Sequence, residues 1–286
     1  MSSNIDWSNT FFGYEPSGWA PFLAAGLFLV LGLLHVVQMI RFKTYYMGWI
    51  IAGAFFETIG YLIRLKSRAD PTVMNIYAAQ NGLIIIAPVF FAASEYILLS
   101  RIINHVGGQF SVIRPSRIAK IFVGIDIVSF LVQIAGTGLL VGTKDISMQD
   151  IGLKIMLFGL ILQVISFAGF LIVAVLFHRR AAHVHGQWSK LIKALYISCI
   201  FILIRSIYRV IEFAQGFKSD LAHNERLMYI FDMGLMVLAI AVFIIVHPGK
   251  ALNGASAGQP AKTDVETPME MGRKRDDNHH REGRRH

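Results

Sequence analysis

Residues 190–211 read KLIKALYISCIFILIRSIYRVI, an apolar run that two arginines, Arg205 and Arg209, interrupt. A bilayer is crossed by about 20 predominantly apolar residues, so this run is long enough, but its arginines make it the weakest span of the chain. Its flanks differ in charge, because four lysines and arginines fall between 179 and 193 and only two between 212 and 226. Since basic loops stay on the cytoplasmic side, the chain is predicted to cross the membrane here.

Six further apolar runs accompany this one. The chain has 286 residues, of which 55% are hydrophobic and only 16% charged, and its mean hydropathy is +0.54. This composition exceeds what the core of a soluble domain requires. We therefore predict an all-α, polytopic membrane protein with seven transmembrane helices. The predicted spans are 18–40, 46–65, 82–103, 118–141, 153–177, 190–211 and 227–247.

Lysine and arginine are unevenly divided between the two sides of the predicted bundle. Of the 27, 18 fall on the side of the C-terminal tail and seven on the side of the N-terminus, and the last two lie inside the sixth span. The positive-inside rule then places the N-terminus outside and the C-terminus in the cytoplasm. The net charge of +9 therefore reflects membrane topology, and no nucleic-acid partner is expected.

The predicted organisation has three parts. Residues 1–17 hold no lysine or arginine, so they lack the basic start of a signal peptide and are predicted to be an extracellular N-terminus. Residues 18–249 form the seven-helix transmembrane domain. Residues 250–286 are rich in Gly, Asp, Glu, Arg and His, and they are predicted to be a disordered, basic cytoplasmic tail.

Ionisable side chains recur inside the spans, although each costs from about 3 to more than 10 kcal/mol in hydrocarbon unless it is paired or hydrated. Glu57, Tyr61 and Arg64 are four and three residues apart and share one helical face, with Arg64 near enough to the outer end to reach water. Asp232 follows Glu225 by one heptad. The candidate substrate-binding or translocation residues are Glu57, Tyr61, Arg64, Gln80, Glu95, Asp126, Gln133, Gln163, Arg205, Tyr208, Arg209, Glu212 and Asp232.

Two interpretations of these charges remain open. They neutralise one another and hold the helices together, at about 0.5–2 kcal/mol for each polar contact, or they line a route or pocket for an amphiphile with a charged head. Small residues, namely Gly136, Gly138, Gly159, Ala168 and Gly169, are predicted to let helices approach closely. Pro88 is predicted to free one backbone carbonyl inside the third span, which a neighbour or water must satisfy.

Motifs of several enzyme classes are missing from the sequence. There is no G-x-x-x-x-G-K-[ST] phosphate loop, no H-E-x-x-H and no pair of cysteines, since Cys199 is the one cysteine. His178, His183 and His185 are expected to be solvated loop residues rather than metal ligands. No catalytic residue, cofactor or metal is therefore predicted, and the chain is not expected to be an enzyme.

Taken together, the motifs resemble those of the fungal resistance-to-aminocholesterol family, also called the lipid-translocating exporter family. The matching residues run from about 14 to 249. They are Tyr14–Ser17 (YEPS), Glu57–Arg64 (ETIGYLIR), Tyr77–Gln80 (YAAQ), Ala87–Pro88, Tyr96–Arg101, Asp126 with Gln133–Gly138 (QIAGTG), Gly159 with Gln163, Arg205–Glu212 (RSIYRVIE) with Gly216, Glu225, Tyr229, Asp232 and His247–Gly249 (HPG).

The resemblance implies a seven-span membrane protein linked to the export of sphingoid long-chain bases, to resistance against toxic amphiphiles, or to porphyrin traffic. The function expected is ATP-independent translocation of a lipid-like amphiphile, with membrane lipids and that substrate as partners. A seven-helix lipid receptor or sensor and a structural subunit remain as alternatives. The plasma membrane is favoured by the resemblance, vacuolar and endoplasmic reticulum membranes stay open, and the sequence leaves the oligomeric state undetermined.

Overall fold

The computed structural model describes all residues except 1–6, 8–9, 11, 144, 216–223 and 254–286. Seven helical segments are long and apolar enough to cross a membrane, as the sequence predicts. The first six are α1 (Ala20–Phe42), α2 (Gly48–Ala69), α3 (Met74–Val106), α4 (Pro115–Gly142), α5 (Ile146–Arg180) and α6 (Trp188–Ala214). Short 3₁₀ turns lie at η2 (Tyr45–Met47) and η3 (Gly108–Phe110).

The seventh crossing is built from several pieces rather than one uniform helix. It comprises α8 (Glu225–Met228), the π-helical turn η4 (Tyr229–Gly234) and α9 (Leu235–Ile245), and α10 (Pro248–Asn253) follows it. Pro248 starts α10, where its missing N–H costs no helical hydrogen bond. The predicted tail boundary at 250 thus falls inside α10, and residues 254–286 of that tail lie outside the described part of the chain.

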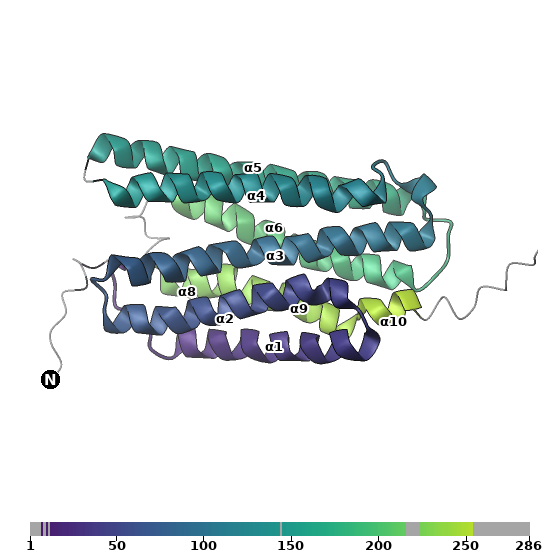
Figure 1. The fold of residues 1–286 in the computed structure, drawn as a ribbon, viewed down its shortest axis with the longest axis horizontal. Coiled ribbons are helices and arrows are strands. Elements are labelled where there is room, and N and C mark those ends of the chain that lie inside the picture. Colours follow the sequence, from purple (N-terminus) through teal and green to yellow (C-terminus); the bar gives the residue numbers. More distant parts are fainter. Residues whose placement is uncertain (1–6, 8–9, 11, 144, 216–223, 254–286) are drawn as a thin grey trace, which may run out of the picture.

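The helices lie side by side along the long axis of the molecule (Figure 1). α3 is the most enclosed of them and packs against α2, α4 and α6. α1 and α2 line one side of it, and α4 and α5 form a hairpin on the opposite side. α9 packs against both α6 and α1, which brings the last crossing back to the first and closes the bundle around α3.

Two helices extend well beyond the predicted spans. α3 has 33 residues and α5 has 35, and a rise of 1.5 Å per residue makes each about 50 Å long, against about 30 Å for the hydrocarbon core. Hydropathy detects only the apolar part of a helix. The helix itself continues beyond it, because the backbone N–H and C=O groups remain paired there as well.

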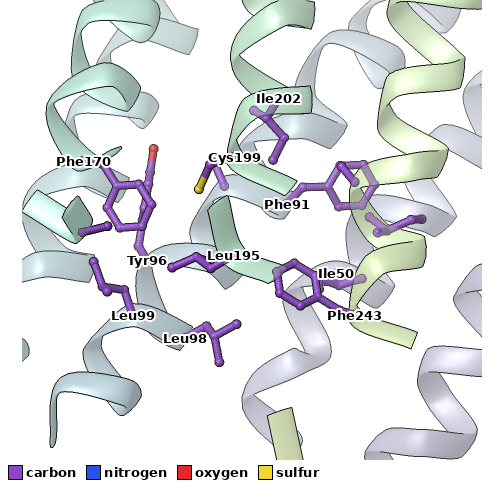
Figure 2. Packing of buried hydrophobic residues seen from close by; sticks show 14 of the residues in the cluster. Ile50, Phe91, Tyr96, Leu98, Leu99, Phe170, Leu195, Cys199, Ile202 and Phe243 are labelled. Atoms are coloured by element: carbon purple, nitrogen blue, oxygen red, sulfur yellow. The ribbon is translucent and has the colours of Figure 1, made fainter. Parts of the chain in front are cut away.

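Buried apolar side chains fill the middle of the bundle. Figure 2 shows the arrangement around α6, with its residues between those of α3 and α5 on one side and those of α2, α3 and α9 on the other. The side chains labelled there include Leu195 and Cys199 of α6, Tyr96 and Phe91 of α3, Phe170 of α5, Ile50 of α2 and Phe243 of α9. This apolar packing fixes α6, which carries both membrane arginines, against α3.

The α4–α5 hairpin is tightened by glycines, in part as predicted. A Cβ at Gly136 would lie 2.5 Å from the backbone nitrogen of Met156, and one at Gly159 would lie 2.8 Å from the carbonyl oxygen of Ser129. Gly138, by contrast, has nothing within 4 Å. Close contact of the two backbones therefore requires glycine at 136 and 159, whereas the prediction for Gly138 was wrong because that residue lies on the outer side of the helix.

Candidate functional site

One face of α2 meets the last crossing along a row of polar side chains. Glu57, Tyr61 and Arg64 are all buried on α2, as their spacing predicts. On the last crossing, Glu225 forms an ion pair with Arg64 at 3.4 Å, and Tyr229 stacks on Tyr61 with ring centroids 6.1 Å apart. The row continues inward to Glu57, which interacts electrostatically with Asp232.

At the inner end of this row lies a group of five ionisable residues, which we call the charge centre: Glu57, Arg205, Arg209, Glu212 and Asp232. Asp232 forms ion pairs with both arginines of α6. Its Oδ1 lies 2.7 Å from Nε of Arg205 and 3.1 Å from Nε of Arg209, and its Oδ2 binds the same Arg209 through Nη2. Arg209 also donates to Glu212 at 3.0 Å. The π-helical turn η4 carries Asp232.

Pro88 explains where Arg205 places its guanidinium. A proline has no N–H, so the carbonyl of Ile84, four residues earlier on α3, loses its helical partner. Arg205 Nη2 donates to that carbonyl at 3.3 Å. The neighbour that satisfies the freed carbonyl is therefore an arginine of the charge centre. The sixth span tolerates this arginine because Asp232 balances its charge and the Ile84 carbonyl accepts a hydrogen bond from it.

Glu57 differs from the other carboxyls of the charge centre. It lies near the middle of α2 and is 1% exposed, and its Oε2 has no hydrogen-bond partner among the described residues. The two arginines nearby are paired with Asp232 and Glu212 instead. A buried carboxyl oxygen without a donor is costly, so Glu57 is the carboxyl of the centre that offers an unused acceptor.

Other unpaired polar atoms surround the same region. The side-chain oxygen and nitrogen of Gln80 on α3, and the hydroxyls of Tyr61, Tyr208 and Tyr229, are buried without a hydrogen-bond partner in the described structure. Gln80 is fully buried, and its backbone carbonyl oxygen would lie 3.5 Å from a Cβ at Gly60 on α2. Buried polar groups are nearly always satisfied in native proteins, so water or a polar ligand fits this region.

Arg64 does not extend to water, contrary to the expectation from its place near the helix end. It is 3% exposed, and the segment before α1 covers it. Tyr14 accepts a hydrogen bond from its Nη2 at 2.9 Å, Phe12 faces its guanidinium at 5.1 Å, and Ser17 binds Glu225 through its backbone N–H at 2.8 Å. Burial raises the pKa of Tyr14 above its usual value. These contacts form a cap over the row.

The remaining candidates form separate contacts. Glu95 on α3 accepts from the hydroxyl of Ser198 and from the thiol of Cys199, 3.1 Å away on α6. Asp126 on α4 accepts from the hydroxyl of Tyr96 at 2.7 Å. These contacts link α3 to α6 and α3 to α4. Two of the residues that make them, Tyr96 and Cys199, belong to the apolar core shown in Figure 2.

Gln133 on α4 donates to Gln163 on α5 at 3.0 Å, next to the glycine contact of that hairpin. The thirteen candidates thus do not adjoin one site. Seven belong to the α2 row and charge centre, Gln80 and Tyr208 lie beside these, and four are bonded elsewhere, namely Glu95, Asp126, Gln133 and Gln163. That a single route for an amphiphile passes all thirteen residues remains a prediction. Sequence reasoning missed Ser198, Tyr14 and Ser17, because no spacing rule pairs residues that lie on different segments.

The described residues contain no group of three or more His, Cys, Asp or Glu arranged to hold a metal ion. The arginines of the charge centre are paired with Asp232 and Glu212, and Glu57 keeps an acceptor oxygen without a donor, so the centre offers hydrogen bonding and charge. The arrangement suits recognition of a charged or polar group inside the membrane.

Comparison with known proteins gives a consistent picture. The sequence profile of the family described as "RTA1 like protein" matches residues 50–255. The chain is 33% identical over 206 residues to "Protein RTA1" of Saccharomyces cerevisiae, covering 69% of this chain and 64% of that protein. It is 30% identical over 201 residues to "Protoporphyrin uptake protein 1" of the same yeast, covering 68% and 65%. The chain thus spans slightly less than two thirds of these two relatives.

A further relative in the same yeast species is named "Sphingoid long-chain base transporter RSB1". It is 26% identical over 283 residues, covering 83% of this chain and 74% of that protein. No solved protein structure matches the chain. The resemblance found in the sequence motifs is confirmed by the profile match, which covers more than half of the chain. This polytopic, integral membrane protein therefore belongs to the RTA1-like family.

Proposed function

We propose that the protein moves a lipid-like amphiphile with a cationic head group from one leaflet to the other without hydrolysing ATP. The observation that carries the proposal is the charge centre, which places three carboxyls and two guanidiniums among the described residues of α2, α6 and η4, at membrane depth. The relatives named for a sphingoid long-chain base, a lipid and a porphyrin support amphiphilic cargo.

The chemistry of Glu57 favours a cation over an anion. Its Oε2 is an unused acceptor, and a charge-assisted hydrogen bond from an ammonium is roughly twice as strong as a neutral one. An anionic head would instead have to compete with Asp232 and Glu212, whose carboxylates already form ion pairs with Arg205 and Arg209. The carbonyl oxygen of the Gln80 side chain, also unpaired, is a further acceptor for an ammonium N–H.

The orientation and the membrane belong to the same proposal. The distribution of lysine and arginine supports an outer N-terminus and a cytoplasmic C-terminus. In that orientation the cap formed by Phe12, Tyr14 and Ser17 covers the outer end of the α2 row. A plasma-membrane protein with a covered outer end is consistent with export from the cytoplasmic leaflet.

Reconstitution in liposomes tests the proposal. A fluorescent single-chain primary amine is placed in both leaflets at pH 6, where an amine with a pKa near 10 stays charged, and the outer label is quenched chemically. The protein is expected to bring the inner label out at a rate well above that of protein-free liposomes. Glu57→Gln is expected to reduce the rate at least tenfold, whereas Asp150→Asn, at an exposed surface pair, is not.

The alternatives give different results in this assay. A lipid sensor would bind the amine without exchanging it between leaflets. A structural subunit would neither bind nor exchange it, and its ion pairs would matter for folding alone. Either result would contradict the translocator proposal.

A further inference from the structure

The charge centre has one more carboxyl than guanidinium among the described residues. Asp232 contacts both arginines, and Glu212 shares Arg209. These four residues carry equal numbers of positive and negative charges and therefore balance. Glu57 is the additional carboxyl, and its Oε2 has no hydrogen-bond donor.

Within the part of the chain that the structure describes, no further cation interacts with Glu57. The charged or titratable groups that interact with it are Asp232 on η4, Arg205 and Arg209 on α6, and Tyr61 on its own helix. Asp232 is negative, and both arginines already bind it. An ionised Glu57 would therefore add an uncompensated charge next to another carboxylate, which a dry interior strongly disfavours.

The other helices packed against α2 present apolar groups at the positions three and four residues from Glu57 along α2. From α3, Ile84 lies 2.8 Å from where a Cβ on Gly60 would be, and Phe91 lies 2.5 Å from one on Gly53. From α1, Phe28 stacks on Tyr61 with ring centroids 6.0 Å apart. None of these neighbours titrates. Since the two guanidiniums are paired with other carboxylates, the described residues leave a proton as the counter-charge for Glu57 when the centre is empty.

We infer that Glu57 holds a proton when the centre is empty and exchanges it for the cationic head group of the cargo. The inference rests on the proposed function and specifies its stoichiometry. On binding, the carboxyl O–H bond of Glu57 breaks, the proton leaves to water, and an ammonium N–H donates to the resulting carboxylate. The centre is neutral before and after, with one proton replaced by one cation.

A consequence for the transport cycle follows from this neutrality. If one proton returns for each cation carried, no net charge crosses the membrane. The exchange is then driven by a pH gradient and is insensitive to membrane voltage, which would otherwise act on each charge carried.

The primary test counts protons during binding. The protein in nanodiscs is titrated with a single-chain primary amine at pH 6 in weak buffer containing a pH indicator, and empty nanodiscs give the baseline. The wild type is expected to release about one proton for each amine bound. Glu57→Gln is expected to bind at least tenfold more weakly and to release none, and Asp150→Asn is expected to behave as the wild type does.

Each other outcome overturns a specific step. Binding by the wild type without proton release contradicts the exchange but leaves the translocator proposal intact. Absence of binding by the wild type contradicts both. Proton release that persists in Glu57→Gln contradicts the assignment to Glu57.

A second measurement needs no variant and so does not depend on the folding of Glu57→Gln. In liposomes, amine exchange by the wild type, after subtraction of the protein-free rate, is expected to follow an imposed pH gradient and to ignore a potassium diffusion potential. Exchange that follows the potential and ignores the pH gradient would overturn the inference.

Discussion

Replacing Asp232 with Asn is the most informative perturbation of the charge centre. The carboxylate is 2% exposed and binds Arg205 at 2.7 Å and Arg209 at 3.1 Å. Asparagine keeps the shape but removes the charge, which leaves Glu212 to balance two buried guanidiniums. Breaking a buried pair in this way costs about 3–5 kcal/mol in soluble proteins, whereas single polar contacts between membrane helices average about 0.6 kcal/mol.

The larger figure is the relevant one here, because a full charge is lost and both arginines are affected. Glu57 limits the loss, since it can give up its proton and face the arginines in place of Asp232. We therefore expect Asp232→Asn to lower the free energy of unfolding by about 3 kcal/mol, a shift of about 150-fold in the folding equilibrium. Adding Glu57→Gln removes that compensation, so the double variant is expected to lose more than the sum of the single losses.

The assay is equilibrium unfolding of the purified protein in detergent micelles, with the single and double variants measured in parallel. Asp150→Asn is the matched control, because it removes an exposed pair with Lys154 that contributes at most about 1 kcal/mol. If Asp232→Asn loses no more than this control, or if its loss and that of Glu57→Gln simply add, the reasoning about the charge centre is refuted.

Three further predictions concern other parts of the bundle. Gly136→Val is expected to lower the free energy of unfolding by about 1–3 kcal/mol through overlap with the α5 backbone, while Gly138→Val, with open space around it, costs under about 1 kcal/mol; equal losses in unfolding titrations would contradict the glycine contact. Pro88→Ala restores a helical N–H that competes with Arg205 for its carbonyl acceptor, so leaflet exchange is expected to fall several-fold while thermal stability holds or rises, and an unchanged exchange rate would argue against a role for the proline. Because burial raises the pKa of Tyr14, its contribution to stability is expected to be complete below the unfolded value of about 10 and to be lost as pH rises through the folded pKa; Tyr14→Phe should lack this alkaline loss in thermal melts, and an identical loss in both proteins would exclude Tyr14 as its source.

The sequence was sufficient for the seven crossings and for the polar face of α2. Span prediction succeeded because each crossing needs about 20 apolar residues, and the sixth span could be assigned from the charges on its two sides. The offsets of four and three placed Glu57, Tyr61 and Arg64 on one face, because that spacing follows the helical period. All three are buried there in the structure.

The pairing between helices could not be predicted from local patterns. The ion pair between Asp232 and Arg209 depends on how η4 packs against α6. The π-helical turn that carries Asp232 has no signature in the hydropathy pattern. Likewise, the contact of Arg205 with the Ile84 carbonyl combines a proline effect on α3 with the position of a different helix. Glu57 differs from Glu212 only in what surrounds it, which periodicity does not reveal.

Selectivity for the charge of the head group tests the central claim most directly. Two single-chain amphiphiles of equal chain length, one with a primary ammonium and one with a sulfate, are titrated calorimetrically into the wild-type protein in nanodiscs, with empty nanodiscs as the baseline. The charge centre, with its additional carboxyl at Glu57, predicts saturable binding of the ammonium at least tenfold tighter than that of the sulfate. Equal affinities, or tighter binding of the sulfate, would contradict it.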